Sequence, residues 1–87
     1  MRRKTREYDT ELRVRGEVLV VDGVSYQGRT VLEEGPDGFA PLDRWAKGVA
    51  ETLGEPVTWY ALDGEEVAAR STVQPERNRA PQNRRAL

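Results

Sequence analysis

The chain of 87 residues contains no cysteine and no histidine. Without cysteine, a disulfide framework and a thiolate metal site are both excluded. Without histidine, the commonest general base and the commonest metal ligand are missing, so no serine can be activated by an imidazole. Adjacent carboxylates at Glu33-Glu34 and Glu65-Glu66 are typical of solvated charge in turns, and no glycine-rich loop resembles a nucleotide cradle. We therefore expect no enzymatic activity, no metal and no cofactor.

Long apolar runs are also missing. No run approaches the roughly 20 residues that cross a bilayer, and the charged N-terminus lacks the apolar segment of a signal peptide. We expect a cytoplasmic protein without membrane contact. Isoleucine is absent and arginine outnumbers lysine 12 to 2. Since Arg, Ala, Gly and Val can all be encoded by GC-rich codons, this usage indicates a high-GC bacterium or a phage that grows in one.

Charge is distributed unevenly along the chain, although the formal net charge is only −1. All 15 acidic residues lie between Glu7 and Glu76, where only six residues are basic, so this span has a formal charge of −9. No acidic residue lies before Glu7 or after Glu76. The basic residues at the two ends are Arg2, Arg3, Lys4 and Arg6, and Arg77, Arg79, Arg84 and Arg85. We expect a basic N-terminal arm over 1–7, a folded domain over 8–74 and a disordered basic arm, rich in Pro and Arg, over 75–87.

The clearest local pattern is a helix over Pro41 to Gly54. Its apolar residues follow the i, i+3, i+4, i+7 spacing of one helix face; they are Leu42, Trp45, Ala46, Val49, Ala50 and Leu53. Pro41 suits the first helical position, Asp43 places negative charge in the first turn, and Gly54 suits the left-handed residue that ends a helix. Only Gly48 opposes the pattern, at a cost of about 1 kcal/mol relative to alanine.

A first hairpin is predicted at Asp22-Gly23. This pair separates two β-branched runs and favours a type I′ turn, in which both central residues need φ > 0. A two-residue loop fixes the register, so that Val21 lies opposite Val24 and Leu19 lies opposite Tyr26. The apolar face near the turn is then formed by these four side chains.

The same register creates a conflict farther from the turn. Val14 would lie opposite Val31, on the other face from the apolar residues near the turn. We expect a β-bulge at Gly16 or Gly28 to restore one apolar face. The alternative is a hairpin that buries parts of both faces.

A second hairpin is predicted at Asp63-Gly64. Its register places Tyr60 opposite Val67 and Trp59 opposite Ala68, although the returning segment is equally compatible with a short helical turn. Because side chains alternate along a strand, one of the two aromatic residues must point away from the face that holds the helix. That residue either anchors an interface or covers the outer face as satellite core.

Together these elements predict an α+β fold in the order β-β-α-β-β, with a mostly antiparallel sheet and the helix packed on one face. Phe39, just before the helix, is expected to pack against the first turn as a hydrophobic staple. A domain of this size hides only about 60% of its unfolded surface. Small domains without disulfides often gain stability from a partner or from self-association.

The favoured function is a small protein-interaction module that docks by a sheet face or edge and by its basic arms, on a protein partner or on itself. The expected partner-binding residues are Trp59, Tyr60, Arg13 and Arg15, the two arginines projecting from one strand face. One alternative is a nucleic-acid-associated protein whose arm residues, named above, contact phosphate or an acidic surface. Another is an inhibitor whose acidic body mimics nucleic acid.

Overall fold

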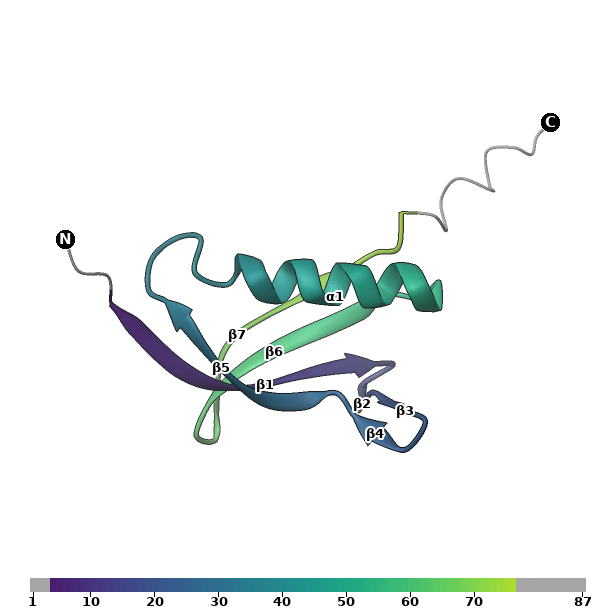
Figure 1. Ribbon diagram of the computed structural model, residues 1–87, viewed down its shortest axis with the longest axis horizontal. Helices are drawn as coiled ribbons and strands as arrows, with labels where there is room; N and C mark the ends of the chain where they lie inside the picture. The colour runs from purple at the N-terminus through teal and green to yellow at the C-terminus, as the bar shows by residue number, and fades with distance from the viewer. Residues whose placement is uncertain (1–3, 77–87) are drawn as a thin grey trace.

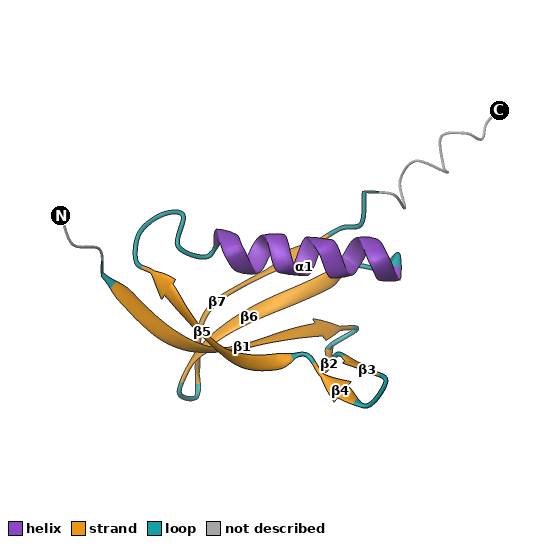
Figure 2. Ribbon diagram, in the orientation of Figure 1, coloured by secondary structure: helices purple, strands orange, loops and turns teal. Residues whose placement is uncertain are grey.

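A computed structural model describes residues 4–76 of the chain. The elements, in chain order, are β1 (Thr5–Val14), β2 (Glu17–Val18), β3 (Val20–Val21), β4 (Val24–Ser25), β5 (Gln27–Glu33), α1 (Ala40–Leu53), β6 (Val57–Asp63) and β7 (Glu66–Val73). The helix lies over one face of an antiparallel sheet (Figure 1, Figure 2). The predicted α+β fold, with strands before and after one helix, is confirmed for the described residues.

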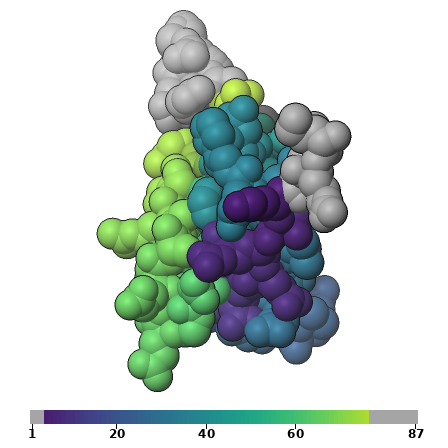
Figure 3. Space-filling view, turned by 90° about the vertical axis from the view of Figure 1, so that its left-hand side faces the viewer, coloured from purple at the N-terminus to yellow at the C-terminus, as the bar shows by residue number. Residues whose placement is uncertain are grey.

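The central strand of the main sheet is β1. On one side it pairs with β5 over residues 5–11 and with β2 at Arg13 and Val14; on the other side it pairs with β6, which pairs in turn with β7. In Figure 3 the purple β1 lies between the green β6 and β7 and the blue segment that includes β5. Residues 5–7, which were expected in the N-terminal arm, therefore begin the central strand.

The ends of α1 follow the predicted sequence signals. Proline occupies the first turn, and Gly54 has φ = 74° and donates its N–H to the Ala50 carbonyl at 2.7 Å. The helix begins at Ala40, one residue before the expected start. The buried members of the predicted apolar stripe are Leu42, Ala46 and Ala50.

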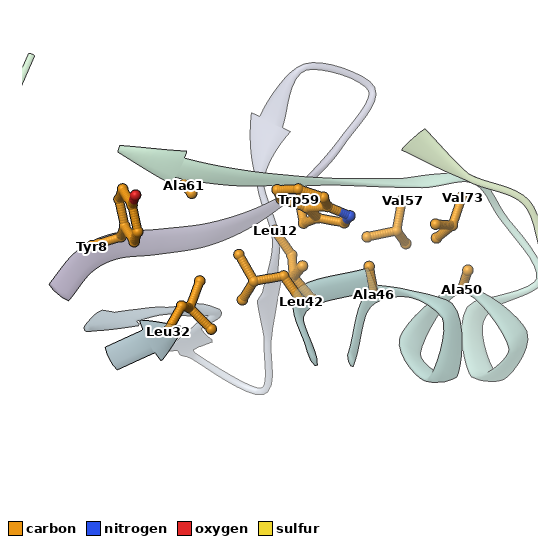
Figure 4. Close-up of a cluster of buried hydrophobic side chains, with 10 residues drawn as sticks. All are labelled: Tyr8, Leu12, Leu32, Leu42, Ala46, Ala50, Val57, Trp59, Ala61 and Val73. Carbon is orange, nitrogen blue, oxygen red and sulfur yellow. The ribbon is translucent and has the colours of Figure 1, made fainter. Parts of the chain in front are cut away.

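The core lies between α1 and the strands β1, β5, β6 and β7 (Figure 4). Its buried hydrophobic residues are Tyr8, Leu12, Leu32, Leu42, Ala46, Ala50, Val57, Trp59, Ala61 and Val73. Trp59 donates its indole N–H to the Asp43 carboxylate at 3.0 Å, which ties β6 to the first turn of α1. The ring of Phe39, expected to staple the helix start, lies 5.5 Å from the ring of Tyr8 and 5.7 Å from that of Trp59.

The tip of the first hairpin is confirmed. Asp22 and Gly23 both have positive φ, of 54° and 80°, and Val21 lies opposite Val24. The N–H of Tyr26 donates to the Leu19 carbonyl at 2.9 Å, in agreement with the predicted register.

The outer part of that predicted hairpin is wrong. Arg15-Gly16, with φ of 56° and 83°, forms a second tight turn, so Val14 pairs with Glu17 and not with β5. Neither glycine carries the expected bulge, because Gly28 pairs with Thr10 in a continuous register. An arginine in the left-handed region is a weak turn signal in a sequence, which is why this turn escaped prediction.

Three two-stranded ladders, β1–β2, β1–β5 and β3–β4, instead meet at Leu12, Leu19 and Tyr26. Leu12 donates its N–H to the Tyr26 carbonyl at 3.0 Å, Leu19 donates to Leu12 at 2.9 Å, and Tyr26 donates to Leu19 at 2.9 Å. This closed ring of hydrogen bonds satisfies the backbone where the three ladders diverge. Each ladder leaves the junction in its own direction. The apolar faces of the three ladders therefore need not coincide, and no bulge is required.

The second hairpin forms with a strand, and the helical alternative is wrong. Its turn is one residue later than predicted, because Asp63 pairs with Glu66. A bulge then leaves Ala68 without a cross-strand partner, since Leu62 pairs with Val67 and the next pair is formed by Ala61 and Ala69.

These two changes overturn the predicted register of β6 and β7. Tyr60 lies opposite Arg70, and Val57 lies opposite Val73. In the predicted register Arg70 would have faced Val57 in the core. The bulge moves the charge outward and buries Val73 instead.

Candidate functional site

The face of the main sheet opposite α1 is covered by no helix or strand of the described chain (Figure 2). Side chains that pair across the strands share a face, and the registers place one row from each strand on this side. We call this surface the open face; its residues are Glu7, Asp9, Glu11 and Arg13 of β1, Gln27, Arg29, Val31 and Glu33 of β5, Thr58, Tyr60 and Leu62 of β6, and Val67, Arg70 and Thr72 of β7.

An arginine and a tyrosine from neighbouring strands meet at the centre of the open face. The guanidinium carbon of Arg13 lies 4.4 Å from the centroid of the Tyr60 ring. The Nε of Arg13 donates to the carboxylate of Glu11, which is only 6% exposed. Gln27, directly opposite Glu11 on β5, contacts the other carboxylate oxygen at 3.4 Å. The buried carboxylate thus orients the arginine over the tyrosine.

The other two carboxylates of β1 on this face lie beside a second arginine. Arg29 donates its Nε to Asp9 at 3.0 Å, and its terminal nitrogen lies 3.5 Å from Glu7. The hydrogen bond to Asp9 and then the charge of Glu7 raise the pKa of Arg29 above its ordinary value. The three β1 carboxylates on the open face therefore share two arginines, and with Glu33 and Arg70 this face has a formal charge of −1 although the surrounding body is acidic.

An apolar strip borders the Arg13–Tyr60 pair. Leu62 follows Tyr60 on the same side of β6 and lies opposite Val67, which is 51% exposed. On the other side of Tyr60 from this strip, the hydroxyls of Thr58 and Thr72 are 2.7 Å apart across β6 and β7. The open face thus combines an aromatic ring, aliphatic groups and ordered polar groups.

The predicted partner-binding residues are only partly brought together. Arg13 and Tyr60 are in contact on the open face. Trp59 points to the helix side and is 4% exposed, so Tyr60 is the outward member of the aromatic pair. Arg15 lies in the turn after β1 and pairs with Glu55 at 2.9 Å, so the expected strand face shared with Arg13 does not form.

Most of the predicted arm contacts lie outside the described residues, namely Arg2, Arg3, Arg77, Arg79, Arg84 and Arg85. Arg6 is part of β1 and lies 3.6 Å from the carboxylate of Asp63. A hydrogen bond with Tyr8 and the charge of Asp63 raise its pKa. The backbone carbonyl of Lys4 accepts the N–H of Glu34 at 2.9 Å, which continues the pairing of β1 and β5.

Sequence reasoning missed Glu11 and Gln27 as members of the site. Glu11 shares a strand face with Arg13 by simple alternation, which was a usable signal. Gln27 is 16 residues away, and only the pairing of β1 with β5 brings it to the carboxylate.

No group of three or more Asp, Glu, His or Cys side chains in the described chain is placed to hold a metal ion. Within residues 4–76, no helix has the length and apolar character needed to span a bilayer. No family model, curated protein or solved structure matches this chain.

Proposed function

We propose that this protein is a small, non-enzymatic protein-interaction module that binds its partner through the open face. The observation that carries the proposal is the Arg13–Tyr60 pair at the centre of an uncovered sheet face. Tyrosine and arginine are the residue types enriched in interface hot spots. The aliphatic groups of Leu62 and Val67 extend this pair into a larger contact surface.

Preorganisation supports the proposal. A long arginine side chain normally loses considerable rotamer freedom when it is fixed in an interface. Here Glu11 and the Tyr60 ring already hold Arg13 in place. A partner that stacks on the arginine or accepts its remaining hydrogens therefore meets a side chain that is already ordered.

The charge of the open face favours a protein over nucleic acid as the partner. Nucleic-acid binding requires cations that are available to phosphate, whereas two of the three arginines on this face, Arg13 and Arg29, are engaged by carboxylates and only Arg70 forms no ion pair among the described residues. The same pairs weaken the alternative of an acidic mimic, because each β1 carboxylate on this face contacts an arginine.

The proposal is tested by affinity capture from the cell that makes the protein, followed by titration calorimetry with the captured partner. The full-length chain is compared with Tyr60→Ala and with the control Val20→Ala, which trims an exposed valine (55%) outside the open face. We expect Tyr60→Ala to weaken binding at least tenfold, since hot-spot residues contribute about 2 kcal/mol or more. Val20→Ala should bind like the unmodified chain.

Two outcomes would contradict this function. One is equal affinity of Tyr60→Ala and the unmodified chain for the captured protein. The other is tight binding of labelled duplex DNA or single-stranded RNA that falls steeply with salt and is unaffected by Tyr60→Ala, which would indicate binding through the basic ends.

A further inference from the structure

The helix α1 covers only part of its side of the sheet. It packs on β6 and β7, and an α-helix about 10 Å wide spans roughly two strands that are 4.8 Å apart. On its other side, toward β5 and the β3–β4 hairpin, an open groove follows the helix. In Figure 1 that hairpin lies below the C-terminal half of α1.

This groove, which we call the α1 groove, consists of two hollows. One hollow, of about 300 Å³, lies between Thr30 of β5 and Pro41 and Leu42 of α1. The other, of about 390 Å³, lies between Val21 of the hairpin and Val49 on the helix.

The ring of Trp45, which is stacked on the ring of Tyr26, lies between the two hollows. The ring centroids of Tyr26 and Trp45 are 6.4 Å apart at an interplanar angle of 17°. Trp45 lines both hollows and Tyr26 lines the one at the hairpin. The groove therefore has an aromatic ridge with an apolar hollow on each side.

The spacing of the hollows matches a second helix. Leu42 lines the first hollow and Val49 lines the second, and these two residues are seven positions or about 10.5 Å apart along α1. Apolar side chains seven residues apart on another helix project at the same spacing. One such side chain would enter each hollow while the backbone between them crosses the aromatic ridge.

Gly48 also fits the close approach of another chain. It lines the hollow at the hairpin, and a Cβ placed on it would meet no atom within 4 Å. The fold itself thus gives no steric reason for glycine in the middle of this helix, where glycine is unfavourable. A helix packed against α1 at this point would supply that reason.

The charge of Arg44 indicates which chemical group the occupant should carry. Arg44 is the only charged residue that lines either hollow, and it forms no ion pair among the described residues. A carboxylate on the occupant, placed between its two apolar side chains, would complement Arg44.

We propose that the α1 groove binds an amphipathic helix of a protein partner, with large apolar side chains seven residues apart in the two hollows and a carboxylate against Arg44. The groove lies on the helix side of the sheet and shares only Gln27, on β5, with the open face, so this is a second binding surface. It does not depend on the function proposed for the open face.

The probe for this site is a labelled, alanine-rich helical peptide of about 16 residues, long enough to form a helix. It carries two leucines seven residues apart and glutamates at the two positions midway between them. Binding to the full-length protein is followed by fluorescence anisotropy. The two tryptophan indole signals in a ¹⁵N–¹H spectrum locate the site: the Trp45 signal should move, whereas that of Trp59, buried against Asp43, should not.

Variants separate binding from folding. Gly48→Arg should weaken peptide binding at least tenfold while raising the melting temperature, because arginine is the better helix former. Glu51→Gln is the matched control, since it changes the charge equally on the same helix but lines neither hollow. Arg44→Glu should weaken binding, and a peptide with lysines in place of the glutamates should restore it.

Three results would overturn the proposal: no peptide binding, binding that Gly48→Arg leaves unchanged, or a homodimer in sedimentation equilibrium that Gly48→Arg dissociates. The last result would assign the groove to a second copy of this chain. Tyr60→Ala should bind the peptide like the unmodified protein, so a failure here is distinguishable from a failure of the open face.

Discussion

Arg13 lies over the ring of Tyr60, with its guanidinium carbon 4.4 Å from the ring centroid. The contact crosses from β1 to β6, where Arg13 is directly opposite Thr58 and Tyr60 is two residues further along. A cation over an aromatic ring at a partly exposed site contributes about 0.5–1 kcal/mol. The buried carboxylate of Glu11 orients the arginine for this contact.

Removing the charge of Glu11 should destabilise the protein. Glu11→Gln keeps the side-chain volume but replaces a charge-assisted hydrogen bond by a neutral one at a position that is only 6% exposed. We expect a loss of about 1–3 kcal/mol in the free energy of unfolding, measured by urea denaturation. The control Glu55→Gln breaks a solvent-exposed pair with Arg15 and should cost about 1 kcal/mol or less. Equal losses in the two variants would rule out a special role for Glu11.

The contact between α1 and β6 through Asp43 should be measurable on its own. Asp43→Ala removes the acceptor of the Trp59 indole and a negative charge from the first helical turn. We expect a loss of about 1–2 kcal/mol and faster exchange of the Trp59 indole proton in NMR spectra. Asp37→Ala, an exposed acid in the preceding loop, is the control and should change stability by less than about 0.5 kcal/mol. An unchanged exchange rate of the Trp59 indole proton in Asp43→Ala would contradict the hydrogen bond between Trp59 and Asp43.

Two glycines of the helical region should respond to alanine in opposite directions. Neither Gly48 nor Gly54 has an atom within 4 Å of an added Cβ, but Gly54 has φ = +74°. Gly48→Ala should stabilise the protein by about 0.8–1 kcal/mol through helix propensity. Gly54→Ala should destabilise it by about 1 kcal/mol or more, because an L-residue is strained in the left-handed region. Thermal unfolding followed by circular dichroism measures both, and effects of the same sign would refute the explanation.

The bulge in β7 predicts which single deletion the strand tolerates. Ala68 has no cross-strand partner, so its removal leaves every pair of β6 and β7 intact and should change stability by about 1 kcal/mol or less. Deleting Thr72 shifts Val73 from the core to the open face. Loss of that buried valine should cost about 1.5–3 kcal/mol and lower the melting temperature. Equal tolerance of the two deletions would show that the register is not fixed by Val73.

The helix was predictable because its signals are local. The apolar period, the proline of the first turn and the glycine at its end act within a few residues, and α1 follows them to within one residue. The tip at Asp22-Gly23 was predictable for the same reason, since its φ angles are a property of the turn residues. The turn at Arg15-Gly16 carries no comparable signal, and it changed the whole register beyond Val14.

The candidate site was less accessible to sequence reasoning. Alternation required one of Trp59 and Tyr60 to point outward, but only the packing of α1 decided that Tyr60 does so. The Glu11–Gln27 contact and the α1 groove join segments that are far apart in the chain. Such contacts depend on the pairing of whole strands and on the surface that the helix covers, which local propensity does not encode.

The sequence by itself therefore determined the helix, the turn at Asp22-Gly23 and the uneven charge along the chain, because these depend on neighbouring residues. The tertiary structure alone decided the partners of β1, the junction of three ladders at Leu12, Leu19 and Tyr26, and the bulge that turns Arg70 outward. The physical reason is that burial and backbone hydrogen bonding are satisfied over the whole chain at once. A strand takes the register that buries most apolar area and pairs most of its backbone groups, even where a nearer partner fits the local pattern.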